Sequence, residues 1–434
     1  MSLSRLAAVV ACLMLLVAAM LAPLPASACP FCSAPSLTLT EQLAGADATV
    51  LVKWTGGKAA KENDTGTTEF EVIEVVNQQK DSKLAKGAKI SLIRYRTGRA
   101  GDLFLLLGTL GGGMIEWGSP LEVTQPGFEY MKDSPKPDQP AVQRLTYFLK
   151  YLEHPDKMIG DDAFGEFANA SYADVVSLAK EMPRDKLRGW LTAKETSAGR
   201  LGLYGMMLGL CGTDADVKLM EQKILETTDD FRLGIDGVMG GYLLLTGDKG
   251  LAVIDEKKLK DKKAPFSETY AAMQALRFMW QYGDGRISLE RLRQSMRILL
   301  ERPELADLVI ADLSRMKDWS MQDRLMAMYD DEAYNVPSIK RAIVRYMLAG
   351  TKDTGEKKPA GDSPAGNNKP APEKVDGDKG TSDKGAGDKP AVPEATVVPV
   401  ELPKHVIHAT ECLAEIEKKD PKTVNEAKRF FLLK

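Results

Sequence analysis

Residues 200–225 read RLGLYGMMLGLCGTDADVKLMEQKIL, and a related stretch follows almost at once. Residues 232–259 read RLGIDGVMGGYLLLTGDKGLAVIDEKKL, and looser copies occupy residues 270–300 and 305–329. In each copy an apolar segment with helical periodicity ends at a short turn that contains aspartate, and a more charged helix follows. The sequence therefore predicts a series of helix pairs.

The turn aspartates give the period of this series. They are Asp214, Asp248, Asp284 and Asp318, and successive ones are 34 to 36 residues apart. A helix pair of this length cannot bury its apolar face alone, so neighbouring pairs are expected to stack into an α-solenoid. We expect the aspartates to cap the second helix of each pair. The pattern resembles HEAT-type repeats, and we expect these repeats over residues 141–350.

A period of two residues replaces the helical period before residue 125. The runs rich in Val, Ile, Thr and aromatic residues cover 46–54, 67–77, 88–96, 101–108 and 114–123. Turns such as Gly56-Gly57 and Gly111–Gly113 separate them. Five short strands in this length predict a small antiparallel β-barrel over residues 29–125.

Part of this N-terminal region is similar to a known family. A cysteine motif at residues 29–32 precedes ADATVLVKW (46–54), LAKGAKISL (84–92) and GDLFLLLG (101–108). This order resembles netrin-like domains such as tissue inhibitors of metalloproteinases, which implies an OB-type barrel. That family has a tighter cysteine pair bonded to distant cysteines, whereas no further cysteine precedes Cys211 here. Protease inhibition through the N-terminal amine is therefore not expected.

Three further segments have distinct compositions. Residues 126–140 are punctuated by proline and predict a linker. Residues 351–400 are rich in Lys, Asp, Gly and Pro, have few apolar side chains to bury, and predict a disordered linker. Residues 401–434 regain apolar residues and predict a short C-terminal helical segment that docks on the repeats.

The first 28 residues are typical of a signal peptide. Arg5 precedes an apolar run, and Ala-Ser-Ala ends the segment before Cys29. We expect cleavage after Ala28 and export to the periplasm, the cell envelope or the extracellular space. No second long apolar run follows, so no transmembrane span is expected in the mature chain. The chain is also similar to bacterial secreted proteins that begin with this CPFC segment, a resemblance that implies no activity.

Cys29 and Cys32 form a CxxC pair around Pro30 and Phe31. A structural disulfide is the favoured interpretation, because thioredoxin-like CxxC pairs follow a strand and open a helix, and no strand can precede a cleaved Cys29. Free thiols stay open as another alternative. A lipid anchor on Cys29 is a further alternative, since lipoproteins carry diacylglycerol on the first mature residue. Ala26 stands where lipoprotein signals usually have Leu.

His405, His408 and Cys412 form the sharper candidate for metal binding. On a helix they would share one face, and imidazole with thiolate could bind zinc or copper. Packing of the segment through Val406 and Ile407 is the competing interpretation. No other cofactor is expected.

Composition excludes several function classes. The net charge of −3 gives no reason to expect binding to nucleic acid or anionic lipid. The whole chain has only 3 histidines, and no nucleophile elbow, zinc-protease or phosphate-loop motif occurs. In GDDAFGEF (160–167), Asp161 or Asp162 is expected to cap a helix with Phe164 and Phe167 facing the core.

These observations predict an exported, non-enzymatic protein. Its helical repeats would offer a surface for an unknown protein partner, as an interaction or scaffold protein of the cell envelope. The alternative hypothesis is a thiol-disulfide redox or metal-binding protein that uses Cys29 and Cys32 or the histidine cluster.

Overall fold

The computed structural model describes residues 29–32, 37–62, 64–79, 84–226, 231–355 and 402–431. The predicted signal peptide and most of the predicted disordered linker lie outside these ranges. The chain divides into two compact units, residues 1–245 and 246–434. This division does not follow the predicted boundary between the β-region and the repeats.

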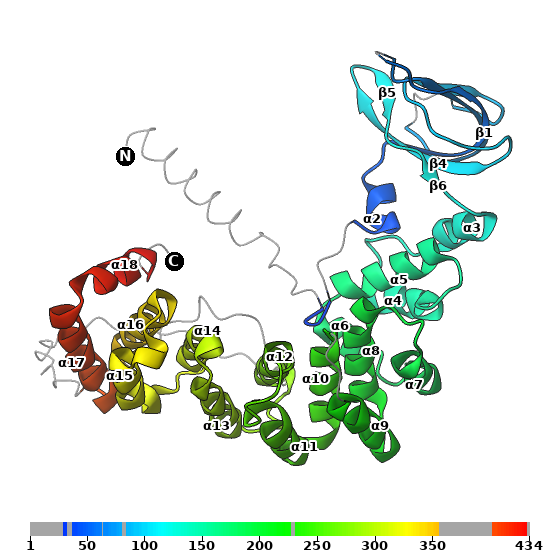
Figure 1. Cartoon of the computed structure of the whole chain (residues 1–434). Coiled ribbons are helices and arrows are strands. Elements are labelled where there is room, and N and C mark those ends of the chain that lie inside the picture. The colour runs from blue at the N-terminus through cyan, green and yellow to red at the C-terminus, as the bar shows by residue number, and fades with distance from the viewer. Residues whose placement is uncertain are drawn as a thin grey trace, which may run out of the picture. The chain divides into compact units, whose positions relative to one another are not determined.

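An antiparallel sheet occupies the N-terminal part of the first unit (Figure 1). Its strands are β1 (Ala48–Lys58), β2 (Thr67–Asn77), β3 (Lys89–Leu92), β4 (Leu103–Gly111), β5 (Met114–Trp117) and β6 (Leu121–Glu122). Each predicted β-run overlaps at least one of them, so the strand predictions are confirmed. The Gly111–Gly113 turn is confirmed too, because Gly112 and Gly113 have φ of 57° and 83° between β4 and β5.

The strand order is β3-β2-β1-β4-β5, with β6 paired to β4, and the described strands do not close into a ring. One face carries the core, in which Val50, Phe70 and Phe104 are fully buried. Strand alternation explains this, because every second residue of β1 and β2 points to the same face. Side chains approach across the open side: Arg94 donates to the carbonyl of Trp117, and Arg96 pairs with Glu122 at 3.2 Å.

The predicted turn at Gly56-Gly57 is wrong, because β1 continues through both glycines to Lys58. A register shift between Trp54 and Gly56 bends the strand instead. A Cβ on Gly57 would lie 3.0 Å from the Tyr95 ring and 3.1 Å from the Thr67 carbonyl. Glycine at position 57 therefore allows the Tyr95 ring and the Thr67 carbonyl to lie close to the backbone of β1.

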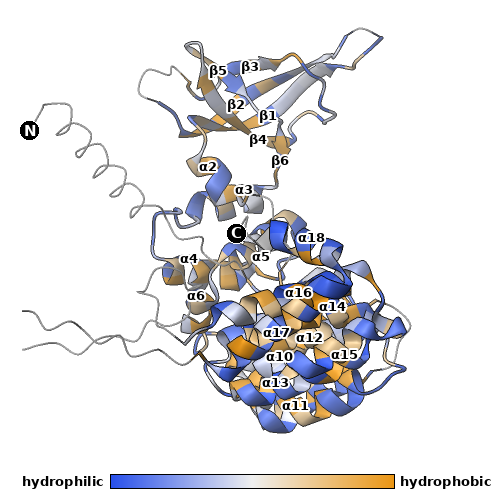
Figure 2. Ribbon diagram, turned by 90° about the vertical axis from the view of Figure 1, so that its left-hand side faces the viewer, coloured by the Kyte–Doolittle hydropathy of each residue, from blue (hydrophilic) through white to orange (hydrophobic). Residues whose placement is uncertain are grey.

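The other secondary-structure elements of the described chain are helices. In the first unit they are α2 (Leu39–Ala44), α3 (Gln125–Asp133), α4 (Ala141–Phe148), α5 (Lys157–Asn169), α6 (Tyr172–Ser177), α7 (Arg184–Thr192), α8 (Ala198–Cys211), α9 (Asp214–Leu225) and α10 (Ile235–Thr246, which ends at the unit boundary). The second unit holds α11 (Asp248–Ile254), α12 (Phe266–Tyr282), α13 (Leu289–Ile298), α14 (Pro303–Arg315), α15 (Gln322–Asp330), α16 (Pro337–Lys352), α17 (Lys404–Lys419) and α18 (Pro421–Phe431). Short turns of other helix types follow or join some of these: η1 (Leu149–Tyr151), η2 (Asp255–Leu259), η3 (Leu299–Glu301), η4 (Trp319–Met321) and η5 (Glu332–Tyr334). Figure 2 shows hydrophilic and hydrophobic residues on the same helices, as expected where one face of a helix is buried.

Each of the four related stretches contains a helix pair, as predicted: α8 with α9, α10 with α11, α12 with α13, and α14 with α15. The segment predicted as a linker over residues 126–140 contains most of α3. Thr124 caps this helix by accepting from the Gly127 amide at 3.0 Å. The proline at its second position needs no amide donor there.

Glycines let α8 and α10 approach closely. A Cβ on Gly205 would lie 2.5 Å from the Cα of Val238, and a Cβ on Gly241 would lie 2.7 Å from the carbonyl carbon of Gly205. Neither residue has room for a side chain. The glycine-rich segment 237–241 therefore has a packing role, which outweighs the cost of glycine within a helix, about 1 kcal/mol relative to alanine.

The predicted capping role of the turn aspartates is wrong for Asp214, Asp248 and Asp284. Thr213 caps α9, Gly247 precedes α11, and Ser288 caps α13. The aspartates at the first two positions lie one residue inside their helices, and Asp284 lies in the turn with φ of 46°.

Asp318 is the exception, because it caps η4 through the Ser320 amide. It also accepts two bonds from Arg297, at 2.7 and 2.8 Å.

The C-terminal helices pack on α16 within the second unit (Figure 1). Val406, Cys412 and Ile416 of α17 are buried, and Gln322 of α15 donates to the carbonyl of His405 at 2.8 Å. The C-terminal segment is therefore helical and packs on α16. Among the residues that the structure describes, no helix is long and apolar enough to cross a membrane.

Candidate functional site

The structure places Cys29 and Cys32 in a turn and joins them by a disulfide. The Cys29 amide donates to the carbonyl of Ala168, near the end of α5, at 3.0 Å, and Cys29 is only 5% exposed. The carbonyl of Phe31 lies close to Gly202 of α8. The segment is thus fixed to two helices of its unit. A disulfide and a lipid thioether use the same sulfur, so they exclude each other at Cys29.

The predicted metal ligands share helix α17, but their side chains have different partners. His408 Nε2 lies 2.6 Å from Asp323 Oδ1 and 3.9 Å from Cys412 Sγ. His405 instead stacks on Trp319 and bonds to the carbonyl of Asp353. The structure therefore brings His408 and Cys412 together and leaves His405 apart. In the described part of the chain, no three His, Cys, Asp or Glu residues are arranged to hold a metal ion. The metal site stays a prediction.

The other two cysteines of the described residues, Cys211 and Cys412, are free thiols with raised pKa values. Burial raises the pKa of Cys412 to about 11, together with nearby carboxylates, of which Asp323 has the largest effect. Burial likewise raises the pKa of Cys211. Because the thiolate is the reactive form, both thiols are poor nucleophiles near neutral pH.

A buried polar cluster on α5 escaped the sequence analysis. Asp162 accepts from the Leu39 amide and from the Tyr130 hydroxyl, each at 2.7 Å. Glu166, one turn further on, accepts from the Thr40 hydroxyl and from Arg144. These contacts fasten α2, α3 and α4 to α5. The only signal in the sequence is the spacing of two carboxylates four residues apart on a face that also carries small residues.

The capping role predicted for Asp161 or Asp162 is therefore wrong. Asp156 caps α5, accepting from the Met158 amide at 3.0 Å. Asp161 lies on the outer side, paired with Arg200 at 2.6 Å. The predicted core position of Phe167 is confirmed, since it is fully buried.

Burial governs the acidity of this cluster. It raises the pKa of Asp162 to about 6, although the bonds from Leu39 and Tyr130 favour the ionised form. Burial and the facing Asp162 raise the pKa of the Tyr130 hydroxyl far above its usual range. Tyr130 therefore acts only as a neutral donor.

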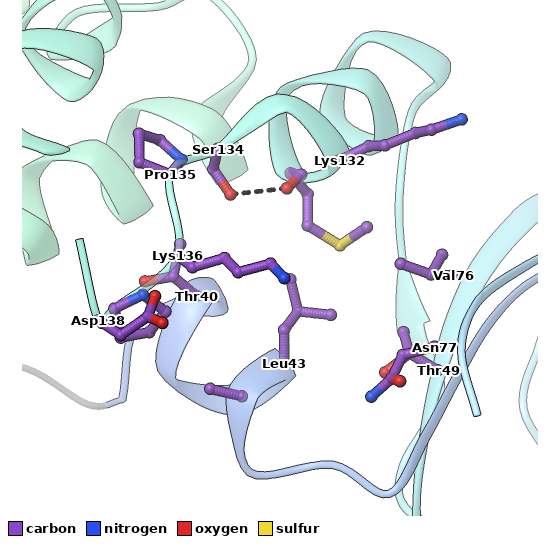
Figure 3. Close-up of a pocket in the computed structure, with 13 residues that line it drawn as sticks. Thr40, Leu43, Thr49, Val76, Asn77, Lys132, Ser134, Pro135, Lys136 and Asp138 are labelled. Atoms are coloured by element: carbon purple, nitrogen blue, oxygen red, sulfur yellow. Dashed lines mark hydrogen bonds between the residues drawn. The ribbon is translucent and has the colours of Figure 1, made fainter. Parts of the chain in front are cut away.

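A cavity of about 480 Å³ adjoins this cluster, and Thr40 of α2 belongs to both. We call it the α2–α3 cavity (Figure 3). It is lined by Thr40, Leu43 and Ala44 of α2, Thr49 of β1, Val76 and Asn77 of β2, and residues 131, 132 and 134–138. The carboxylates of α5 hold α2, so they also fix one wall of this cavity.

Polar groups of the cavity fall into two kinds. Ser134 has a hydrogen-bond partner, because its hydroxyl donates to the carbonyl of Met131. The Lys132 ammonium also has a partner, Glu74. Thr49 differs: its residue is fully buried, and its hydroxyl oxygen has no hydrogen-bond partner within the described ranges. Such an orphaned buried hydroxyl is unusual.

Comparison of the chain with protein-family models, curated proteins and solved structures finds no match. The proposals that follow therefore rest on the chemistry of this chain.

Proposed function

We propose that this chain is an exported, non-enzymatic interaction protein of the cell envelope. In this proposal the sheet is an OB-like barrel, the helix pairs stack as a HEAT-like solenoid, and the outer surface of the pairs binds a protein partner. The observation that carries the proposal is a set of buried aspartates, each held by an arginine from another helix.

The links recur along the helices. Arg277 of α12 bonds to Asp312 of α14 at 2.6 Å, and Arg291 of α13 bonds to Asp255 of η2, also at 2.6 Å. The Arg297–Asp318 pair adds a third link. All three aspartates are at most 7% exposed. Buried charges must be paired, so these links fix neighbouring helices in one register. A stack held in this way is a rigid surface, as interaction modules require.

Side chains across the open side of the sheet support the barrel in this proposal. Arg94 and Arg96 follow β3, and they reach the carbonyl of Trp117 and the carboxylate of Glu122. These contacts bring the two ends of the strand order towards each other, as in a partly open OB barrel.

The cysteines support export and a non-enzymatic role. The Cys29–Cys32 disulfide suits an oxidising compartment. The free thiols have raised pKa values, which disfavour thiol catalysis.

The test is site-specific photo-crosslinking in intact cells. A photoreactive residue replaces Phe266, Leu289 or Leu308, which are 50%, 41% and 38% exposed on α12, α13 and α14. Matched controls carry it at Lys249 and Lys257, which are exposed and polar. We expect one recurrent partner from the apolar positions.

The captured partner must then bind the purified mature chain saturably. Binding should be unchanged in Cys29→Ser/Cys32→Ser, because the proposal assigns the disulfide no catalytic role. Crosslinks that are equal at control and apolar positions would contradict the proposal, as would binding that needs a free thiol.

A further inference from the structure

We propose that the α2–α3 cavity binds an apolar α-amino acid as a zwitterion. Within the described residues, the lining offers one positive and one negative side chain without an ion-pair partner, one buried hydroxyl without a hydrogen-bond partner, and an apolar wall. This binding site goes beyond the interaction function proposed above.

The size and the apolar lining fit a small amphipathic ligand. The volume of about 480 Å³ lies within the range of small-molecule sites, roughly 300–1,000 Å³. The apolar side chains come from α2, β2, α3 and the segment that follows α3: Leu43, Ala44, Val76, Met131, Pro135 and Pro137. An aliphatic side chain of the ligand would be desolvated against them.

The charges that line the cavity are complementary to a zwitterion. Lys136 and Asp138 are two residues apart on the same segment, and both are exposed. Within the described chain, neither lies within 4.0 Å of an opposite charge, so they do not pair with each other. Figure 3 shows Lys132 directed away from the cavity and Lys136 directed across it towards α2. Lys136 is therefore the group that can bind a carboxylate, and Asp138 the one that can bind an ammonium.

Thr49 supplies an independent indication of a ligand. Thr49 lines the cavity, and its buried hydroxyl has no hydrogen-bond partner in the described residues. A carboxylate held by Lys136 would accept a hydrogen bond from it and satisfy the orphaned group. The neighbouring Asn77 amide nitrogen is occupied, since it donates to the carbonyl of Ala46 at 3.2 Å.

The experiment titrates the mature chain, residues 29–434, with four probes by calorimetry. L-leucine carries both charges and the side chain, 4-methylpentanoate lacks the ammonium, 3-methylbutylamine lacks the carboxylate, and glycine lacks the side chain. We expect leucine to bind with Kd at or below about 1 mM and each other probe at least about tenfold more weakly. No binding of leucine up to about 10 mM would overturn the proposal. So would 4-methylpentanoate binding as tightly as leucine.

Variants locate the site. Lys136→Gln and Asp138→Asn should each weaken leucine binding about tenfold or more, whereas the exposed Lys86→Gln, outside the cavity lining, should leave it unchanged. Thr49→Val keeps the side-chain shape and removes the orphaned hydroxyl. It should weaken binding without lowering the melting temperature, so a folding defect cannot explain the loss. Leucine binding that is unchanged in all three cavity variants would place the ligand elsewhere and refute the site.

Discussion

Replacement of Gly241 by alanine tests the close packing of α8 and α10. The new Cβ would lie 2.7 Å from the carbonyl carbon of Gly205, closer still to its oxygen, and 2.9 Å from the Met220 methyl. The Met220 methyl can move, but the backbone of α8 cannot do so without separating the helices. Ordinary van der Waals contact begins near 3.4 Å.

The expected magnitude follows from two opposing terms. Alanine within a helix gains about 1 kcal/mol over glycine. Overpacking of a tight core costs about 1–3 kcal/mol, and a backbone clash lies at or above the upper end of that range. We therefore expect Gly241→Ala to lower the free energy of unfolding by about 2 kcal/mol. Gly189→Ala in α7 is the matched control, because a Cβ there meets nothing within 4 Å. Gly189→Ala should raise the free energy of unfolding by up to about 1 kcal/mol.

Hydrogen exchange read by mass spectrometry is the assay, because a chain with two units need not unfold in one step. Peptides that cover α8 and α10 should exchange faster in Gly241→Ala and no faster in Gly189→Ala. Equal protection of α8 and α10 in both variants would refute the account of these glycines.

Three further outcomes are expected. Asp312→Ala should lower the free energy of unfolding of the second unit by roughly 2–4 kcal/mol, because it leaves the partly buried Arg277 without its carboxylate. The control Asp307→Ala, on the same helix, should change it by less than about 0.5 kcal/mol. Urea unfolding is the measurement, and equal effects of the two variants would show that the Arg277–Asp312 link is unimportant. The pKa of Asp162 is about 6 in the folded chain, above its ordinary 3.8, so between these values the folded chain binds more protons than the unfolded chain. The free energy of unfolding should therefore fall by roughly 1–3 kcal/mol as pH rises from about 4 to about 7. Asp162→Asn should remove that slope in melting curves, and an unchanged slope would contradict it. Cys412, with its pKa raised from 9.0 to about 11, should have a roughly 100-fold lower thiolate fraction at pH 8, so timed alkylation that is as fast as in the unfolded chain would contradict its burial.

The sequence predicted the features that depend on periodicity. Alternation located the strands, including β2 at its observed bounds, and the repeated stretches located four helix pairs. Leu145, Phe148, Leu149 and Leu152, which recur at helical spacing, are all buried. These signals survive in one sequence because burial acts on every residue of an element.

The features that depend on distant contacts were not predicted. Asp162 was expected to be a helix cap and Glu166 was given no role, because their partners on α2 lie up to 126 residues away in the chain. Asp318 could be expected as a cap, but its arginine partner comes from the preceding helix pair. The α2–α3 cavity joins α2, two strands and residues 131–138, which no local pattern connects.

We propose that the helix pairs bind a protein partner, and the affinity of the captured partner is measured at equilibrium to test this proposal. The chain of residues 29–434 is compared with its disulfide variant Cys29→Ser/Cys32→Ser and with its triple surface variant Phe266→Ser/Leu289→Ser/Leu308→Ser. The account predicts that the triple variant binds at least about tenfold more weakly, since about 1.4 kcal/mol corresponds to that factor, and that the disulfide variant binds normally. Normal binding by the triple variant together with loss in the disulfide variant would contradict the account and move the activity to the cysteine pair.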